Sequence, residues 1–513
     1  MPGSGGVSRR EFLEGGATAA ALTLVPRHVL GGRGYVPPSD RINVGYVGLG
    51  TQGLRQLMPA LRQPDLRIAA VCDPNRRSDD YVEWFRHELR DKVRDFLGDS
   101  SWAEGARACP GGREVGREIV DRHYGAAGGA GCPAYADFRE MLAREKDLDA
   151  VYVMTPDHLH ATIAVAAIKA GKHVITHKPL SNVLHEARVV VEAARESGVA
   201  TQMFCAAGLD STPLLTEWIQ AGAIGPVREV HNWSARPYWP QGMTSLPPEI
   251  PEVPAGFDWD LWLGPVPHRP YHPAYTHAVF RGWYDFGTGA LGDMGHYSFF
   301  QVFRILRLGA PLTVEASRSQ YWRIDDLLWG RVANTVSYPR ASLVHWEFPA
   351  REGMPPVSLH WYDGGLRPPK PRELDEDGEP MPEEGLLFVG DLGKILAEFN
   401  GRGPRLIPKA RMARFTTPAP TLPRPADELS QWIRACRGTT PSDARFESVY
   451  PMTEAILLGT IALRVDGKLR WDAARGRFVD APQADALMLR EYREGWRLGS
   501  SVDAGREPFP SGR

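Results

Sequence analysis

A glycine-rich turn after an apolar stretch is the feature that most constrains the fold of this chain. Residues 42–47 lead directly into Gly48-Leu-Gly-Thr-Gln-Gly53, which has the form G-x-G-x-x-G, and a second apolar stretch at 67–72 ends at Asp73. Such glycines allow a tight turn, the helix that follows points its N-terminus at a pyrophosphate, and the acid can bond ribose hydroxyls. The sequence therefore predicts a dinucleotide site that contains Gly48, Gly50, Thr51, Gln52, Gly53 and Asp73.

The acidic residue also bears on which dinucleotide is bound. A carboxylate at position 73 would repel a 2′-phosphate, which favours NAD over NADP. Arg76 and Arg77 follow closely and weaken that preference, because cations there would attract the phosphate. We predict NAD as the cofactor, with NADP as the less favoured alternative.

Residues 40–205 alternate short apolar strands with helical stretches, a pattern typical of a parallel α/β sheet. Strands are expected at 42–47, 67–72, 149–154, 173–176 and 199–204, and helices at 52–62, 159–170 and 183–197. Residues 75–134 interrupt the pattern with a charged helical run from Ser78 to Leu97 and a glycine-rich loop. An insertion of this length predicts either a lid over the cofactor or an oligomer contact.

The pattern changes after residue 205. Apolar residues alternate with period two at 227–233, 313–321, 332–338 and 342–348, which predicts a largely antiparallel sheet facing the first domain. Helices are expected at 425–437 and 448–464, and a polar surface loop at 367–384. We therefore predict an α/β Rossmann domain (40–205), an α+β domain with a large, mostly antiparallel open sheet for substrate binding and oligomerisation (206–475), and a C-terminal extension (476–513).

The sequence of residues 1–34 predicts an export signal and a linker. Ser8-Arg-Arg-Glu-Phe-Leu13 matches the twin-arginine pattern S-R-R-x-F-L, and the weakly apolar stretch at 15–25 is too short for a stable membrane span. We expect export by the twin-arginine machinery to the periplasm or cell surface, on a route that carries folded proteins with cofactor already bound. The net charge of −2 gives no support for a nucleic-acid partner.

Five cysteines, at positions 72, 109, 132, 205 and 436, form no C-x-x-C motif and no zinc pattern. We expect single buried thiols, with a pair between Cys109 and Cys132 as the alternative. No metal site is predicted.

Polar residues after two further strands are candidates for the chemistry. Thr155-Pro-Asp-His-Leu-His160 follows the strand at 149–154, and His177-Lys178-Pro179 follows the next strand. Ligands bind at the carboxyl ends of parallel strands, so we assign Thr155, Pro156, His158, His160, His177 and Lys178 to the cofactor site. A lysine whose pKa is lowered by burial there can act as a general acid or base.

A glycine-rich segment supplies the third group of candidates. Asp293, His296 and Tyr297 fall on the first turns of an expected helix, where residues three or four apart share a face. Asp293 can act beside His296 or Tyr297, or it can cap the helix. The aromatic residues between 233 and 303 either stack on sugar rings or pack in a core. Candidates for contacts to sugar hydroxyls are His272, Tyr275, Arg281, Tyr284 and Asp285.

Together these motifs resemble the Gfo/Idh/MocA oxidoreductases, named for glucose-fructose oxidoreductase, inositol dehydrogenase and rhizopine catabolism. The resemblance covers residues 40–475 and also rests on Asp258-Trp-Asp-Leu-Trp-Leu-Gly-Pro265 and Gly289-Ala-Leu-Gly-Asp-Met-Gly295. It implies NAD(P)-dependent hydride transfer at a ring hydroxyl carbon of a sugar, glycoside or cyclic polyol. It further implies Lys178 as the catalytic lysine, Asp293 as the substrate-orienting aspartate, and a homo-oligomer formed through the second-domain sheet.

Two positions depart from the family pattern. His177 replaces a usual glutamate, and Tyr297 stands where the family usually has the histidine that takes the hydroxyl proton. A phenol has an unperturbed pKa near ~10, so we predict Lys178 and Tyr297 as a coupled pair, with His296 as the rival base.

Two other functions stay open on the sequence. One is redox-neutral, NAD-dependent cleavage of a glycoside through a transient keto-sugar, which export favours because free NAD is scarce outside the cytoplasm. The other is a non-catalytic sugar-binding protein that contains NAD, which only the altered positions 177 and 297 support.

Overall fold

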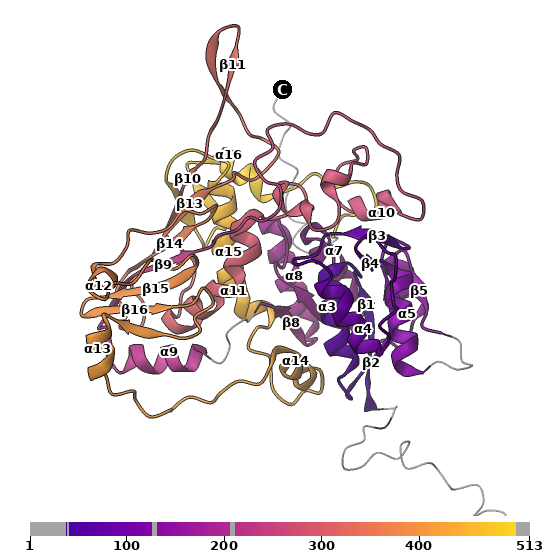
Figure 1. The fold of residues 1–513 in the computed structure, drawn as a ribbon, viewed down its shortest axis with the longest axis horizontal. Coiled ribbons are helices and arrows are strands. Elements are labelled where there is room, and N and C mark those ends of the chain that lie inside the picture. The colour runs from indigo at the N-terminus through magenta and orange to yellow at the C-terminus, as the bar shows by residue number, and fades with distance from the viewer. Residues whose placement is uncertain (1–36, 38–39, 126–130, 206–210, 499–513) are drawn as a thin grey trace, which may run out of the picture.

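The computed structural model describes residue 37 and residues 40–125, 131–205 and 211–498. Two sheets organise these residues, one in the N-terminal part (indigo and purple in Figure 1) and one in the part coloured from pink to yellow. The expected export signal lies outside the described residues. Among the described helices, none has the length and apolar character needed to cross a membrane.

The first sheet has six parallel strands in the order β5-β2-β1-β6-β7-β8. The strands are β1 (Ile42–Val47), β2 (Leu66–Cys72), β5 (Ala134–Tyr135), β6 (Ala150–Val153), β7 (His173–His177) and β8 (Thr201–Phe204). The main helices between them are α3 (Thr51–Leu61), α5 (Arg113–Tyr124), α6 (Phe138–Arg144), α7 (Asp157–Lys169) and α8 (Leu184–Ser197). Outside the insertion at 75–134, the strands and helices expected in 40–205 are confirmed, close to their expected bounds.

Helices cover both faces of this sheet, so successive strand residues enter two different cores. Val44 and Tyr46 of β1 belong to the core that contains residues of α3 and α5, whereas Val151 and Val153 of β6 belong to the core beneath α7 and α8. Strands buried on both faces are apolar at nearly every position. This arrangement aligns the carboxyl ends of the parallel strands at one edge, where the predicted site residues follow.

The insertion after β2 is not the single helical run expected from Ser78 to Leu97. It contains β3 (Ser78–Tyr81), α4 (Glu88–Leu97) and β4 (Cys109–Gly111), and β3 pairs with β4. Tyr81 explains the difference, because its buried ring packs against the glycine turn at Gly50 and its hydroxyl accepts a hydrogen bond from Asn75 Nδ2 at 3.0 Å. Those contacts hold residues 78–81 extended beside the predicted cofactor site.

The second sheet has nine strands in the order β17-β16-β15-β9-β14-β13-β10-β18-β19. They are β9 (Val227–Trp233), β10 (Thr313–Arg318), β13 (Ser342–Phe348), β14 (Val357–Tyr362), β15 (Gly385–Gly390), β16 (Gly393–Ala397), β17 (Arg405–Ile407), β18 (Leu469–Asp472) and β19 (Arg477–Val479). Every neighbouring pair is antiparallel except β9 and β14, which run parallel. The expected mostly antiparallel sheet is therefore confirmed.

Two long helices, α11 (Gly289–Leu306) and α15 (Phe446–Ala462), cover one face of the second sheet. The ring of Phe299 on α11 packs edge-on against Trp346 of β13 and Trp361 of β14. Trp346 Nε1 also donates to the carbonyl oxygen of Ala455 on α15 at 2.8 Å. Because α15 packs against α8 on its other side, this helical layer joins the two sheets.

The stretch 332–338 was expected to be a strand, and this prediction is wrong. Residues 333–338 form a loop in which the Val336 carbonyl accepts from the Tyr284 amide and the Tyr338 amide donates to Gly282, so their backbone groups pair outside the sheet. The preceding β12 (Leu328–Val332) pairs only with β11 (Tyr321–Asp325), and the two form the hairpin that projects from the body in Figure 1.

The other described helices are short. They are α9 (Ser211–Gln220), α10 (Trp259–Leu263), α12 (Arg372–Glu376), α13 (Lys409–Arg414), α14 (Glu428–Cys436) and α16 (Pro482–Asp485), with 3-10 turns at Pro273–Tyr275, Val279–Gly282 and Ala486–Met488. The helices expected at 425–437 and 448–464 correspond to α14 and α15. All five cysteines are free, so the alternative pair between Cys109 and Cys132 is not formed.

Candidate active site

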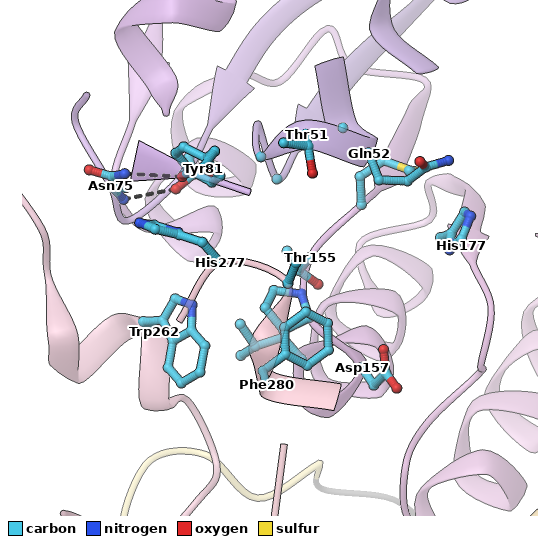
Figure 2. A pocket seen from close by; sticks show the side chains of 18 of the residues that line it. Thr51, Gln52, Asn75, Tyr81, Thr155, Asp157, His177, Trp262, His277 and Phe280 are labelled. Carbon is cyan, nitrogen blue, oxygen red and sulfur yellow. Dashed lines mark hydrogen bonds between the residues drawn. The ribbon is translucent and has the colours of Figure 1, made fainter. Parts of the chain in front are cut away.

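The glycine turn and the start of α3 form one wall of a cavity of about 800 Å³, counting its open mouth (Figure 2). Gly48 has a φ of +97°, and a Cβ atom there would lie 2.5 Å from the backbone carbon of Met154. At Gly53 a Cβ atom would lie 2.1 Å from the carbonyl oxygen of Gly48. Gly50 precedes α3 without a side-chain cap, so the first amides of the helix are left for an anion in the cavity.

Asp73 lies at the same wall, at the end of β2. Its Oδ2 accepts from the Leu49 amide at 2.7 Å and its Oδ1 from the Asn75 amide at 2.8 Å. Burial raises the pKa of Asp73, and these two backbone hydrogen bonds oppose that shift. The carboxylate is thus fixed in position, and each oxygen keeps a lone pair for a ribose hydroxyl.

A segment of the second domain closes this nucleotide end of the cavity. The Arg76 amide donates to the Gly256 carbonyl at 2.8 Å, and the Asp258 amide donates to the Pro74 carbonyl at 3.1 Å. Phe257, between them, lines the cavity. The backbone after β2 is therefore bonded directly to the second domain.

His277 makes the second contact across this end, as Figure 2 shows. Its ring centroid lies 3.9 Å from that of Tyr81, and its Nε2 lies 3.3 Å from Asp80 Oδ1. His277 and Ala278 have φ values of +46° and +68°, in the left-handed region that residues other than glycine rarely occupy. Such a conformation persists only where surrounding contacts impose it, and here those contacts enclose the cavity.

The cavity wall contains polar atoms that lack partners. Gln52 Oε1 and Thr155 Oγ1 are buried and have no hydrogen-bond partner among the described residues, although buried polar groups are nearly always paired. Both side chains line the cavity between the glycine turn and the end of β6. These unpaired atoms and the glycine cradle fit a nicotinamide dinucleotide.

Lys178 follows β7 at the other end of the cavity, where it is 3% exposed. Its ammonium contacts Asp293 Oδ1, and Arg281 Nε donates to the same oxygen at 2.8 Å. Burial lowers the pKa of Lys178, and Asp293 opposes that shift. Burial acts to raise the pKa of Asp293, but the two cations outweigh it and hold that pKa below its usual range. Lys178 and Arg281 line the cavity, with Asp293 as their shared counter-ion.

Asp157, which was not among the predicted site residues, also lines this end. It is the first residue of α7, and its Oδ2 accepts from Thr288 Oγ1 at 2.8 Å, just before α11. Burial raises the pKa of Asp157, and Arg281 opposes this shift. Two cations and two carboxyl groups thus meet at the Lys178 end of the cavity.

The structure brings the ring rather than the hydroxyl of Tyr297 to Lys178. Lys178 Nζ lies 4.8 Å from the ring centroid of Tyr297, whose hydroxyl lies 3.2 Å from His177 Nε2. Burial raises the pKa of Tyr297 well above its ordinary value and lowers the pKa of His177 well below its own. Both shifts favour the neutral side chains and disfavour the predicted role of Tyr297 as a base.

The rival base, His296, is also excluded from the cavity. Its ring is fully buried, with Nδ1 2.6 Å from the Gly292 carbonyl oxygen one turn earlier in α11. Burial lowers the pKa of His296 to about 3. It is a neutral core residue in this structure.

Two predicted cofactor residues, His158 and His160, do not line the cavity. His158 Nε2 lies 2.8 Å from the Trp262 carbonyl oxygen, and its ring packs on Phe286. His160 lies 2.6 Å from the Pro179 carbonyl oxygen and 2.7 Å from that of Thr155. Because α7 begins at Asp157, the side chains of His158 and His160 point into the protein interior and not into the cavity. His160 bonds the backbone that follows β6 and β7.

Four of the five predicted sugar contacts also lie elsewhere; only Arg281 lines the cavity. His272 caps a 3-10 turn by accepting from the Ala274 amide at 3.0 Å. Tyr275 is buried among aromatic rings, and Tyr284 packs against Tyr338 in the second-domain core. Asp285 is exposed and paired with Arg269. The aromatic segment thus serves mainly as packing.

The remaining lining residues come largely from the insertion and the second domain. They are Pro74, Asn75, Tyr81, Met154, Asp157, Leu159, Phe257, Trp262, His277, Ala278 and Phe280. Asp157 and Leu159 lie inside the 155–160 motif, and Met154 directly precedes it at the expected strand end. The alternating strands and helices gave no means of finding the others.

Two family models match the chain. Residues 117–204 match an NAD-binding Rossmann-fold domain of the oxidoreductase family, and residues 221–333 match that family's C-terminal alpha/beta domain. The two models describe domains of the Gfo/Idh/MocA oxidoreductase family, so these two segments are similar to that family. The first match begins inside α5, and the glycine turn at 48–53 lies outside it.

Curated relatives are similar over short stretches. A 1,5-anhydro-D-fructose reductase from Ensifer adhaerens is 42% identical over 100 residues, 19% of this chain and 30% of the relative. A levoglucosan dehydrogenase from Pseudarthrobacter phenanthrenivorans is 32% identical over 111 residues, 20% of this chain and 28% of the relative. The chain thus spans less than a third of the length of these relatives.

Solved structures share the two-domain fold. The WlbA dehydrogenase from Bordetella pertussis, in complex with NADH and UDP-GlcNAcA, has a TM-score of 0.51 at 15% identity, over 84% of this chain and 99% of that chain. At this identity the likeness shows the fold alone.

Proposed function

We propose that the protein is an NAD-dependent oxidoreductase that transfers hydride at a ring hydroxyl carbon of a sugar, glycoside or cyclic polyol. The observation that carries the proposal is the buried group of Lys178, Arg281 and Asp293 at one end of the cavity that the glycine turn lines at its other end. The sugar class is supported by the names of the two curated relatives, a 1,5-anhydro-D-fructose reductase and a levoglucosan dehydrogenase.

The residues divide the chemistry among them. A bound NAD supplies the hydride acceptor. Lys178, whose pKa is lowered by burial, takes the hydroxyl proton in its neutral form. Arg281 holds the hydroxyl oxygen, and Asp293 keeps both cations in place. His177 and Tyr297 form a hydrogen-bonded pair beside Lys178 that orders this wall of the cavity.

We propose NAD over NADP because the Asp73 carboxylate lies where a 2′-phosphate would be repelled. Arg76 and Arg77 are exposed rather than directed into the cavity wall. We also propose that NAD is retained tightly, because the backbone bonds of the segment at 256–258 and the His277 contacts would have to open before it leaves.

A second candidate function follows from that enclosure. Redox-neutral cleavage of a glycoside, through transient oxidation of the sugar and return of the hydride, needs no exchange of the nucleotide. Release of aglycone without accumulation of NADH would support this function, whereas NADH formed in proportion to product would support net oxidation.

The test of the main proposal uses Lys178→Met. We expect the purified variant to retain NAD, measured by native mass spectrometry, and to lose about 10²- to 10⁴-fold in kcat on a sugar that the wild type oxidises. Lys146→Met is the matched control, because Lys146 is exposed and lies outside the cavity. Full turnover by Lys178→Met would overturn the assignment.

Export by the twin-arginine route remains our proposal on the motif at 8–13. Changing Arg9 and Arg10 to lysine should leave the protein in the cytoplasmic fraction, with NAD loaded. A periplasmic variant would contradict this.

We propose a homo-oligomer as well. The β11–β12 hairpin projects with Trp322, Ile324, Leu327, Leu328 and Trp329 all exposed, and an isolated two-stranded hairpin is at best marginally stable in water. A second copy of the chain would cover it. Replacing Trp322 and Leu327 with serine should lower the mass measured by sedimentation, and an unchanged mass would refute this contact.

A further inference from the structure

The second sheet carries a row of histidines across three neighbouring strands. His345 of β13 pairs directly with His360 of β14, and His360 pairs directly with His231 of β9. Residues directly opposite each other on neighbouring strands place their side chains on the same face of the sheet. The register therefore brings the three imidazoles together from distant parts of the chain.

This row lies on the face that α11 and α15 leave uncovered. On β13 the alternate residues Val344 and Trp346 are fully buried beneath the helices, and on β14 Leu359 and Trp361 are likewise buried. The histidines point the other way and are half-buried. The row is thus separated by the sheet from α11, whose first turns carry Asp293.

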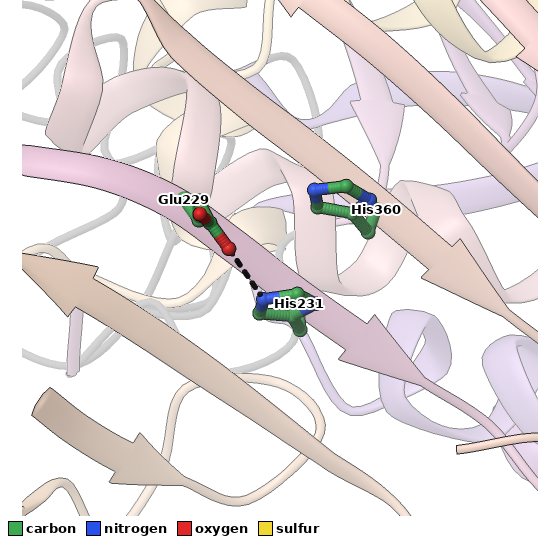
Figure 3. Close-up of side chains that lie close together, drawn as sticks. All are labelled: Glu229, His231 and His360. Carbon is green, nitrogen blue, oxygen red and sulfur yellow. Dashed lines mark hydrogen bonds and ion pairs between the residues drawn. The ribbon is translucent and has the colours of Figure 1, made fainter. Parts of the chain in front are cut away.

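A carboxylate completes the cluster, as Figure 3 shows. Glu229, two residues before His231 on β9, places Oε2 3.2 Å from His231 Nε2. The His360 ring stacks on that of His231, with centroids 4.7 Å apart. One ligand-type atom from each of Glu229, His231 and His360 lies within 4.8 Å of the other two. Two imidazoles and one carboxylate are a donor set that divalent transition metals, zinc among them, accept.

The outer contacts match what a metal-binding histidine needs. His231 Nδ1 lies 3.1 Å from the Tyr362 hydroxyl, while Nε2 faces the carboxylate. A second-shell hydrogen bond of this kind fixes the ring orientation and leaves the opposite nitrogen for the metal. The half-exposed Glu229 carboxylate turns toward the His231 ring from the same strand.

Charged groups face the row from other strands and loops. They are Glu315, Glu347, Lys394 and Lys468. Neutral imidazole is the form that binds a metal ion.

We propose that Glu229, His231 and His360 bind a divalent transition-metal ion, best satisfied by Zn²⁺, on the uncovered face of the second sheet. The ion links β9 to β14, the only parallel pair in that sheet among the described strands. Glu229 is half exposed on this face of the single chain. This site is independent of the proposed NAD site, which lies among other elements.

The test uses tag-free protein stripped with a chelator and then dialysed against Zn²⁺ at tens of micromolar. We expect one zinc per chain by elemental analysis, and a tetrahedral-type visible spectrum when Co²⁺ replaces zinc. His231→Gln and His360→Gln should each weaken binding by at least about tenfold. His268→Gln is the matched control, because His268 is exposed and outside the cluster.

Melting temperatures in chelator show whether the variants fold. We expect zinc to raise the wild-type and His268→Gln values and to leave the two cluster variants unchanged. Equal zinc binding by wild type and the His231→Gln/His360→Gln double variant would overturn the proposal, as would no zinc bound by the wild type. Neither outcome depends on NAD or on turnover.

Discussion

Replacing Asp293 with asparagine tests whether the protonation of Lys178 sets the pH dependence of turnover. Asp293 contacts the Lys178 ammonium and is the largest influence that opposes the effect of burial on its pKa. An opposite charge within 4–6 Å typically shifts a pKa by about 1–3 units. Asparagine keeps the shape and removes the charge, so the pKa of Lys178 should fall by about that amount. A base that acts when neutral then becomes active at lower pH.

The assay is kcat/KM against pH for sugar oxidation, followed by reduced-nicotinamide absorbance. We expect the rising limb of the Asp293→Asn profile to move about 1–3 pH units toward acid. Asp285→Asn is the matched control, because Asp285 also pairs with an arginine but lies outside the cavity. Its profile should stay in place. A limb that is unmoved in Asp293→Asn, or that moves toward alkaline pH, would refute Lys178 as the base.

Asp293→Asn should also lower the free energy of unfolding, which limits the temperature of the assay. It leaves Lys178 and Arg281 buried with only Asp157 as a nearby carboxyl group. Breaking a buried ion pair from one side typically costs about 3–5 kcal/mol. The free energy of unfolding should fall by that order, so the profiles are measured well below the melting temperature of the variant.

Three further predictions concern the cofactor and the cavity wall. Gly53→Ala should abolish NAD retention in a fluorescence titration, because its Cβ would clash with backbone, whereas Gly309→Ala, where a Cβ would meet nothing within 4 Å and which lies outside the cavity, should retain it. Tyr297→Phe keeps the ring beneath Lys178 but loses the hydroxyl, and should lower kcat by about tenfold, much less than removal of the lysine. The hydrogen bond to His277 lowers the pKa of Asp80 to about 2. This contact is therefore formed above the ordinary carboxyl pKa near ~4 and is lost as the pH falls toward about 2. The rate of NAD release should rise over that pH range, and Asp80→Asn should raise it at neutral pH.

The first domain was predictable because its signals are local. Strands such as β1 and β6 are buried on both faces, so their sequences are apolar at nearly every position, and glycine or polar residues follow close behind them. In the second domain only some strands stood out. Strand β15 reads as a short apolar run after a polar loop, and the parallel pairing of β9 with β14 joins segments far apart in sequence. No local periodicity encodes that pairing.

Some residues of the candidate site were likewise predictable from local sequence, and others were not. Gly48, Asp73 and Lys178 follow strand ends, so topology alone placed them in one cavity. Which aromatic residues face the cavity depends on how the segment at 257–286 folds on itself, and there Tyr275 enters a core while Phe280 reaches the cavity. The role of Tyr297 depended on burial, which raises the pKa of its phenol and disfavours the expected base.

The closed nucleotide end of the cavity constrains the kind of reaction more than the residues at the sugar end do. If the contacts of His277 and of residues 256–258 keep NAD bound between turnovers, the nucleotide must be restored to its oxidised form in place. The hydride then returns to the same sugar or passes to a second one. A substrate deuterated at the oxidised ring carbon distinguishes these routes: return gives a cleaved product that keeps its label, and transfer puts the label in a different molecule. Transfer of the label to added NAD would show instead that the contacts of His277 and of residues 256–258 open in every cycle. That result would refute the proposal that NAD stays bound between turnovers.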